Sequence, residues 1–377
     1  MRHARFLSLS LLVLAFGLAA CSTDTSSFAG TVPPAPLSGT FRDVGPFDAG
    51  VTTLTLADRR VEVWYPVNRA DVAGMSPVPY FIRDALPDAL QAILADDINP
   101  PFQTAAYRDA RASGNGSFPL VVFAHGSSSY RNQSTFLTTH LASWGFVVAS
   151  VDYLERGLQG FLGDEPDPVL DDVELTRMVV ALMASENEVD GGLLNGRVST
   201  DQIAITGHSA GGGTSIRFGG EPDVVTYIPL AMGISSESTI ELPDKPSLWI
   251  AGAIDEVVSP ERTANAFAAA STPARHVVIE AMGHLGPSDI CAVGENGGGV
   301  IAIALEAGLP LPENLVRLGT DGCQDEAIAP EDGWPTINHF VTAQLRWAFG
   351  FDDEPVGLSQ DAEDDLPEAV FIYEESL

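Results

Sequence analysis

Ile203-Ala-Ile-Thr-Gly-His-Ser-Ala-Gly-Gly212 is the stretch that says most about the fold of this chain. An apolar strand pattern runs directly into Gly207-His-Ser-Ala-Gly211, a pattern typical of a sharp strand-to-helix turn that exposes a serine nucleophile. The turn forces Ser209 into a strained backbone conformation. Side chains at positions 207 and 211 would collide with neighbouring backbone, which explains Gly207 and Gly211. A Gly-rich turn without a catalytic role is the structural alternative.

Apolar runs and helix-like segments alternate along the chain on both sides of this strand-to-helix turn, which we call the elbow. The strand-like runs cover 118–125, 146–152, 203–207, 225–230, 247–252 and 276–280, and the helix-like segments cover 132–144, 171–189, 209–218, 260–270 and 336–349. Continuous rather than alternating hydrophobicity indicates strands that are buried on both faces. The chain is therefore predicted to be an α/β protein with a mostly parallel central sheet and helices on both faces. Residues 51–56 and 60–65 alternate and predict an antiparallel leading hairpin on that sheet.

A single large domain over residues 40–350 accounts for this rhythm. Two stretches depart from it, 70–117 and 286–334. The first contains a predicted helix over 83–94, and the second contains an apolar helix-like run over 300–307. Long excursions from a compact sheet either form lids and binding walls or simply pack on its outside.

A serine hydroxyl needs a general base, and the base needs an orienting acid. In a sheet of this design, both lie on loops at the carboxyl ends of later strands. Asp255 directly follows the predicted strand 247–252, whereas Asp244 and Asp223 precede strands. Asp255 is therefore the predicted acid, with an ordinary surface carboxylate as the alternative.

His284 is the predicted base, because it lies in Met282-Gly-His-Leu-Gly286 just after the strand 276–280. His276 begins that strand and His339 falls inside the last helix, so both are interpreted as packing or surface residues. Backbone N–H groups of Ala210 and Ser127 are the predicted oxyanion hole, since Ala210 follows the nucleophile and Ser127 lies in the loop after strand 118–124.

Two further histidines lie near this site in the sequence. His125 is expected to brace the oxyanion loop rather than act as a base. His208, inside the elbow, is expected to point away from the substrate carbonyl.

The N-terminus has the features of a secretion signal: Arg2 and Arg5, an apolar run over 6–18, and small residues before Cys21. The run is too short to span a membrane. Leu18-Ala-Ala-Cys21 further resembles a bacterial lipobox, which predicts a signal peptide over 1–20, lipidation of Cys21 and a flexible tether over 21–39. The chain is thus expected to be exported to the cell envelope with the lipid as its membrane contact; ordinary cleavage near Ala20 is the alternative.

The net charge of the chain limits the classes of partner that it can bind. A formal net charge of −32 argues against nucleic acid and anionic surfaces as partners. The acidic tail, 351–377, has one apolar stretch at 370–373, so it is either disordered or docked by that end.

Cys291 and Cys323 form an even pair in a chain that is expected to be exported. They predict a disulfide worth roughly 3–4 kcal/mol, with two buried thiols as the alternative. Neither cysteine has a second ligand at metal-binding spacing, so no metal site is predicted.

Four motifs together resemble the α/β-hydrolase superfamily: Phe123-Ala-His-Gly126, Gly207-His-Ser-Ala-Gly211, Gly252-Ala-Ile-Asp255 and Gly283-His284. The resemblance spans about 40–350 and is strongest to the bacterial branch of predicted dienelactone hydrolases, similar to platelet-activating-factor acetylhydrolase, chlorophyllase and polyester hydrolases. True dienelactone hydrolases carry cysteine where this chain carries Ser209, so their lactone substrate is not carried over. The resemblance implies cofactor-free cleavage of carboxylic esters.

The expected function is therefore a serine esterase that forms an acyl-enzyme on Ser209 and acts on small-molecule or polymeric esters. A catalytically silent binding protein on the same scaffold and an amidase or peptidase with the same triad remain open. An epoxide hydrolase or dehalogenase is disfavoured, because those relatives attack with Asp at the elbow. Acyl length, alcohol group and oligomeric state are left open by the sequence.

Overall fold

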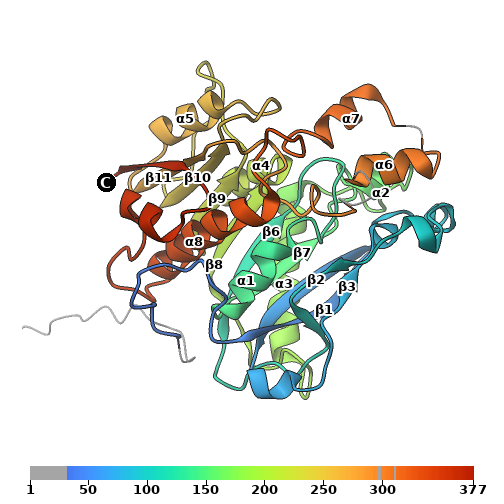
Figure 1. Cartoon of the computed structure of the whole chain (residues 1–377). Helices are drawn as coiled ribbons and strands as arrows, with labels where there is room; N and C mark the ends of the chain where they lie inside the picture. The colour runs from blue at the N-terminus through green and yellow to red at the C-terminus, as the bar shows by residue number, and fades with distance from the viewer. Residues whose placement is uncertain (1–31, 295–298, 310) are drawn as a thin grey trace, which may run out of the picture.

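The computed structural model describes residues 32–294, 299–309 and 311–377 (Figure 1). The predicted signal peptide over 1–20, the lipidation site Cys21 and most of the tether over 21–39 lie outside the described residues, and they stay predictions. Within the described part of the chain, every helix is too short or too polar to cross a bilayer.

A ten-stranded sheet in the order β12-β11-β10-β9-β8-β6-β7-β2-β1-β5 forms the centre of the molecule. Its parallel part contains β6 (Phe118–Ala124), β7 (Val147–Val151), β8 (Val198–His208), β9 (Val224–Leu230), β10 (Ser247–Gly252) and β11 (Ala274–Ile279). The leading hairpin of β1 (Asp48–Leu56) and β2 (Arg59–Val67) joins it antiparallel through β7, and the short β5 (Ala106–Arg108) pairs parallel with β1. The predicted fold class is confirmed.

Helices cover both faces of the sheet, as parallel strand connections require. On one face, α1 (Thr135–Ser143) and α8 (Pro330–Ala348) pack on a core that includes Leu137, Phe340 and Phe123. On the other, α3 (Asp172–Glu188), α4 (Ala210–Phe218) and α5 (Pro260–Ala269) pack on a second core. The sheet is thus buried on both sides, which is why its strands are continuously apolar in the sequence.

The excursion over 70–117 does not contain the predicted helix over 83–94. Its chain forms short 3-10 turns over 82–85, 91–93 and 96–98, and the small sheet of β3 (Pro79–Tyr80) and β4 (Phe102–Gln103). The physical reason is Pro87, which lies in the middle of the predicted helix, lacks an N–H and clashes with the preceding turn. Apolar spacing alone was a misleading guide there.

The described residues of the excursion over 286–334 include α6 (Gly299–Glu306), α7 (Glu313–Leu318) and the first turn of α8. The expected apolar helix over 300–307 is confirmed by α6, whereas α7 and the short α2 (Leu158–Phe161) have no counterpart among the predicted elements. Ile303 of α6 packs against Leu86 and Leu94 of the first excursion. The two excursions, far apart in sequence, therefore meet beside α2 at one end of the molecule (Figure 1).

The acidic tail is docked. Its end forms β12 (Phe371–Ser376), which pairs antiparallel with β11, the edge of the parallel part. Phe371 is buried and packs edge-on against Phe340 of α8. Of the two alternatives that the sequence left for the tail, docking by its aromatic end is therefore the one observed.

Candidate active site

Ser209 lies at the turn between β8 and α4, at the carboxyl edge of the sheet. Its backbone has φ 53° and ψ −119°, the strained conformation that the sequence pattern predicted. A Cβ at Gly211 would lie 1.9 Å from the Ala124 carbonyl oxygen, and one at Gly207 would lie 2.5 Å from the Gly211 carbonyl oxygen. The two glycines therefore let the elbow pack directly on β6.

Ser209, His284 and Asp255 form a continuous hydrogen-bonded row. The Ser209 Oγ lies 2.9 Å from His284 Nε2, and His284 Nδ1 lies 2.9 Å from Asp255 Oδ2. Because a carboxylate only accepts, Nδ1 carries the proton and Nε2 is left to accept from the serine hydroxyl. The loops after β8, β10 and β11 bring these three side chains together, although they are distant in sequence.

Asp255 is held so that one oxygen faces the imidazole. Its other oxygen, Oδ1, accepts from the backbone N–H groups of Val257 and Val258 at 2.8 and 2.7 Å. Both Asp255 and His284 are buried, which strengthens their interaction by excluding water. The arrangement can orient His284 and stabilise it when it becomes protonated.

The rejected acid and base candidates lie elsewhere. Asp244 is exposed before β10. His276 faces Glu374 of β12 at 3.1 Å, and His339 of α8 contacts the backbone of Phe41 and Gly357 at 3.0 and 2.8 Å. His276 thus links β11 to β12, and His339 links α8 to the segments near residues 41 and 357. Neither histidine approaches Ser209.

The amides of Ser127 and Ala210 are available on the other side of the nucleophile. Among the described residues, neither N–H donates to a protein acceptor. Ala210 is the first residue of α4, so its N–H is one of the helix's unpaired donors. Ser127 lines the same pocket as Ser209. The predicted oxyanion donors are thus free to bind a substrate oxygen.

His125 braces the oxyanion loop, as expected. Its Nδ1 donates to the Gly126 carbonyl at 2.8 Å, and its Nε2 accepts from the Tyr153 N–H at 2.9 Å. Burial lowers the pKa of His125 well below its ordinary value, and the nearby Arg156 lowers it further. The ring is therefore neutral and acts as a fixed spacer below the loop.

His208 connects the two sides of the site through Gln133. The Gly126 N–H donates to Gln133 Oε1 at 2.7 Å, the Gln133 amide donates to His208 Nδ1 at 2.8 Å, and His208 Nε2 donates to the His284 carbonyl at 2.7 Å. Burial, with His284 nearby, lowers the pKa of His208 to about 3, so the ring stays neutral. Sequence reasoning missed Gln133, which looks like an ordinary residue before a helix.

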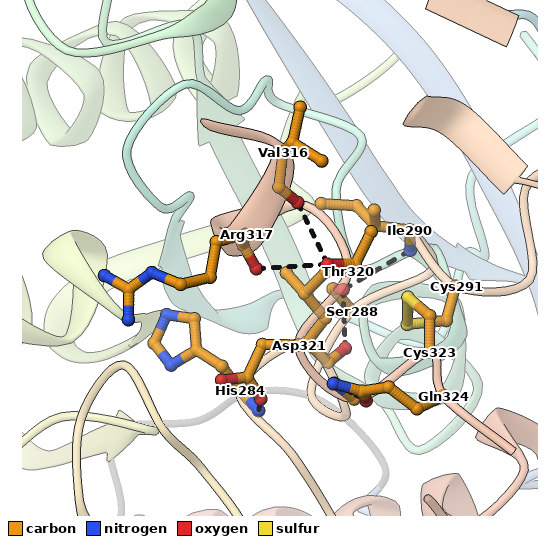
Figure 2. Close-up of a disulfide and its surroundings, with 12 residues drawn as sticks. His284, Ser288, Ile290, Cys291, Val316, Arg317, Thr320, Asp321, Cys323 and Gln324 are labelled. Carbon is orange, nitrogen blue, oxygen red and sulfur yellow. Dashed lines mark hydrogen bonds between the residues drawn. A yellow bond between two sulfur atoms is a disulfide. The ribbon is translucent and has the colours of Figure 1, made fainter. Parts of the chain in front are cut away.

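The Cys291–Cys323 disulfide is present, which confirms the predicted pair. Figure 2 shows it beside His284 and Asp321. The Asp321 Oδ1 accepts from the His284 N–H at 2.8 Å, and Oδ2 accepts from the Glu256 N–H at 3.0 Å. A single buried carboxylate, two residues before Cys323, therefore ties the histidine loop to the loop that carries Asp255. No sequence signal marked Asp321, because it only meets these loops in the folded chain.

A pocket of about 910 Å³, including the part open to solvent, lies over Ser209 and His284. Both excursions contribute to its wall, through Leu86 and Leu94 from the first and Ile303 and Leu315 from the second. Of the two roles that the sequence left open for the excursions, forming a binding wall is therefore the one observed.

Known proteins resemble this chain in sequence and in fold. The chain matches the family described as PETase, PET hydrolase-like, over residues 105–292, about half of its length. It is 27% identical over 150 residues to the bis(hydroxyethyl) terephthalate hydrolase of Streptomyces coelicolor, covering 40% of this chain and 43% of that protein. The aligned part is thus less than half of the relative's own length.

Its structure is also similar to that of a ferulic acid esterase from Streptomyces cinnamoneus, with a TM-score of 0.61 and 21% identity over 86% of this chain and 96% of the other. At that identity the likeness concerns the fold. The matched family, the sheet order and the strand-to-helix serine turn agree with each other, and the chain belongs to the α/β-hydrolase superfamily, in its branch of polyester hydrolases and esterases.

Proposed function

We propose that this protein is a serine carboxylic-ester hydrolase that forms an acyl-enzyme on Ser209. The observation that carries the proposal is the hydrogen-bonded row from Ser209 through His284 to Asp255, with both bonds at 2.9 Å and the serine on a strained elbow facing a pocket. The similarity to a bis(hydroxyethyl) terephthalate hydrolase supports ester cleavage as the reaction type.

In the first half-reaction, the Ser209 oxygen attacks the ester carbonyl carbon while His284 Nε2 accepts the hydroxyl proton. The negative charge that develops on the carbonyl oxygen is stabilised by the amides of Ser127 and Ala210. Collapse of the tetrahedral intermediate breaks the bond to the alcohol oxygen, which takes the proton from His284. Asp255 keeps the imidazole in the required tautomer and stabilises its charged form.

In the second half-reaction, water enters where the alcohol left and His284 Nε2 accepts a proton from it. The water oxygen attacks the acyl carbon, and collapse returns the proton to the Ser209 oxygen and releases the carboxylic acid. The same residues therefore serve both halves, as microscopic reversibility requires, without an external cofactor.

Ser209→Ala tests the proposal. It should abolish labelling by a fluorophosphonate reagent and lower kcat for p-nitrophenyl butyrate by about 10⁴-fold or more, since only binding and oxyanion stabilisation remain. The measurements are mass spectrometry of the labelled chain and steady-state kinetics. Retention of more than a tenth of the wild-type rate would show that Ser209 is not the nucleophile.

Variants of the proposed acid and base are compared with variants of the two candidates that were rejected for these roles. His284→Ala and Asp255→Asn should each cause losses of several orders of magnitude, because each removes a member of the row. Asp244→Asn and His276→Ala, which alter residues away from the site, should remain near the wild-type rate. If either control is the more damaging, the assignment of acid or base is wrong.

Amide hydrolysis and a silent binding role are the alternatives. A silent scaffold would not react with the fluorophosphonate reagent, and a peptidase would turn over a p-nitroanilide faster than the matching p-nitrophenyl ester. We expect labelling of Ser209 and faster turnover of the ester.

We further propose that the enzyme is attached to the cell envelope through a lipidated Cys21. The sequence pattern before that residue supports the proposal. A tether over 21–39 would keep the catalytic domain in the aqueous phase near the membrane.

A further inference from the structure

The floor and the wall of the pocket over Ser209 have opposite character. Polar side chains are confined to the floor, in the loop over 126–130, at Gln133 and His208, and at Ser209 and His284. The wall is built mainly from aliphatic side chains, among them Leu86, Leu94, Leu158, Leu162, Ile303 and Leu315. The reacting ester group has polar partners at the floor, whereas the rest of the substrate meets hydrocarbon.

The wall is a packed structure of its own. Leu86 and Leu94 of the first excursion and Ile303 of α6 are buried against one another. Leu158 of α2 and Leu162, directly after α2, pack on them. Because these side chains are packed against one another, the wall of the cavity is preformed and an apolar group can enter with little reorganisation.

Charge excludes several classes of occupant. Among the described residues that line the pocket, none is Lys, Arg, Asp or Glu. A carboxylate, a phosphate or an ammonium group would be desolvated there without a partner, at a large free-energy cost. A polyester strand would bring further ester groups against the same aliphatic wall, where their oxygens would lack hydrogen-bond donors. The wall therefore favours one uncharged hydrocarbon group.

Aromatic groups also fit this wall less well. Tyr130 is the one aromatic side chain among the described lining residues, apart from the histidines of the floor. Sites that select aromatic rings commonly offer ring faces or edges to pair with them. The family match covers residues 105–292, so it includes neither Leu94 nor Ile303 of the wall. The substrates named for the relatives therefore give no information about what this wall binds.

We propose that the substrate is a monomeric ester with an aliphatic hydrocarbon group, which occupies the pocket walled by the two excursions and α2. The proposal rests on the serine esterase function above and names the substrate class of the same site. It predicts that the rate depends on chain length: each methylene buried in the pocket should raise kcat/KM by up to about fourfold until the pocket is full.

Two series of esters test the proposal on the whole protein. One varies the acyl chain of p-nitrophenyl esters from acetate to palmitate, and the other varies the alcohol of alkyl acetates. In one series, kcat/KM should rise at least tenfold above its shortest member and then fall, and the series that responds identifies the side of the ester that the pocket binds. Bis(hydroxyethyl) terephthalate and a polyester film should be cleaved more slowly than the best aliphatic ester.

Ala304→Phe and Ala302→Phe are the matched variants. Both change α6 by the same side chain, but only Ala304 lines the pocket. Ala304→Phe should lower kcat/KM for the best ester at least tenfold and move the optimum to a shorter chain. Ala302→Phe should keep the wild-type profile.

The outcomes separate this proposal from the one on which it rests. If Ser209 reacts with the fluorophosphonate reagent but both series are flat or fall from their shortest member, the substrate class is wrong and the esterase function stands. The substrate class is also wrong if the aromatic diester or the polymer is the better substrate, or if the two α6 variants shift the profile alike. If neither labelling nor turnover of any ester occurs, the esterase function itself fails.

Discussion

His284 is held by two carboxylates that act on different parts of it. Asp255 contacts the imidazole, whereas Asp321 accepts from the backbone N–H of His284 and from that of Glu256. The neighbouring chain is also tightly fitted, since a Cβ at Gly283 would lie 2.5 Å from the Gly322 Cα. The position of the base relative to its acid is thus set by main-chain contacts as well as by the hydrogen bond between their side chains.

Asp321→Ala should remove the acceptor of the His284 and Glu256 N–H groups, the first of which is buried, and let the histidine loop shift. We expect kcat to fall by about 10- to 100-fold with little change in KM for a short ester, because small displacements of a base affect the transition state more than ground-state binding. Steady-state kinetics and the rate of fluorophosphonate labelling measure this effect. Asp325→Ala, an exposed position on the same loop, is the control. Equal effects of the two variants, or a change confined to KM, would contradict this role of Asp321.

Asp289 is a buried carboxyl group that lies against the N-terminus of α1. Its Oδ2 accepts from the Thr135 N–H at 2.6 Å and its Oδ1 from the Phe136 N–H at 3.2 Å. Burial nevertheless raises its pKa from 3.8 to about 7, with these hydrogen bonds opposing the shift. A raised carboxyl pKa means that the folded protein holds this proton more tightly than the unfolded chain does. The stabilisation is complete below pH 3.8 and is lost as the pH rises toward 7.

Asp289→Asn should remove this pH dependence. Between pH 5 and 7, the free energy of unfolding of the wild type should fall relative to that of the variant by roughly 1.4 kcal/mol per pH unit, and the difference should be constant above about pH 8. Urea unfolding of both proteins at pH 5, 6, 7 and 8 gives the comparison. Parallel curves over this range would show that Asp289 does not titrate there.

At the scale of elements, the excursion over 286–334 contributes both to the pocket and to the position of His284. The segment over 286–334 supplies part of the pocket wall through α6 and α7, and it also carries Asp321 to the histidine loop. The disulfide between Cys291 and Cys323 closes this segment across 32 residues. Pocket and base are therefore coupled through one covalently closed element.

Replacing both cysteines, Cys291→Ala with Cys323→Ala, should lower the free energy of unfolding by roughly 3 kcal/mol, since the unfolded chain regains the entropy of the open loop. Thermal and urea unfolding measure the loss. Turnover should also fall, because Asp321 lies two residues from the lost bridge. Comparison of the wild type with and without dithiothreitol is the control, and unchanged stability in both tests would show that the bridge contributes little.

At the scale of the whole molecule, the protein is strongly acidic and its predicted anchor is far from its site in sequence. The formal net charge of −32 opposes binding of the domain itself to anionic lipid. Attachment to the envelope would therefore depend on the proposed lipid on Cys21, while the candidate site residues lie between 127 and 284.

Cys21→Ser should move the protein from the membrane fraction to the soluble fraction without changing kcat/KM for a soluble ester. Fractionation followed by immunoblotting and kinetics on each fraction measure the two parts. A high-salt wash of the wild-type membranes is the control, because it removes proteins held by charge alone. Persistence of the variant in washed membranes would refute lipidation as the anchor.

The sequence by itself determined the elements whose causes are local. Gly207 and Gly211 predicted the elbow because only glycine fits the steric demand of that turn, and continuous apolar runs predicted buried parallel strands. Asp255 and His284 were predicted because chain order places each directly after a strand, and in parallel strands those ends share one edge. The disulfide was predicted from an even pair of cysteines in a chain that was expected to be exported.

Only the tertiary structure decided which residues far apart in the sequence contact one another, because no local sequence pattern pairs them. Asp321 meets His284 and Glu256 only because the closed segment folds back, and Gln133 meets His208 only across the site. The pocket wall combines Leu94 with Ile303, and Phe371 joins the sheet edge from the far end of the chain. Such pairings depend on which surfaces are left to bury after the sheet forms, and hydrophobic burial is non-directional, so the residues alone do not identify their partners.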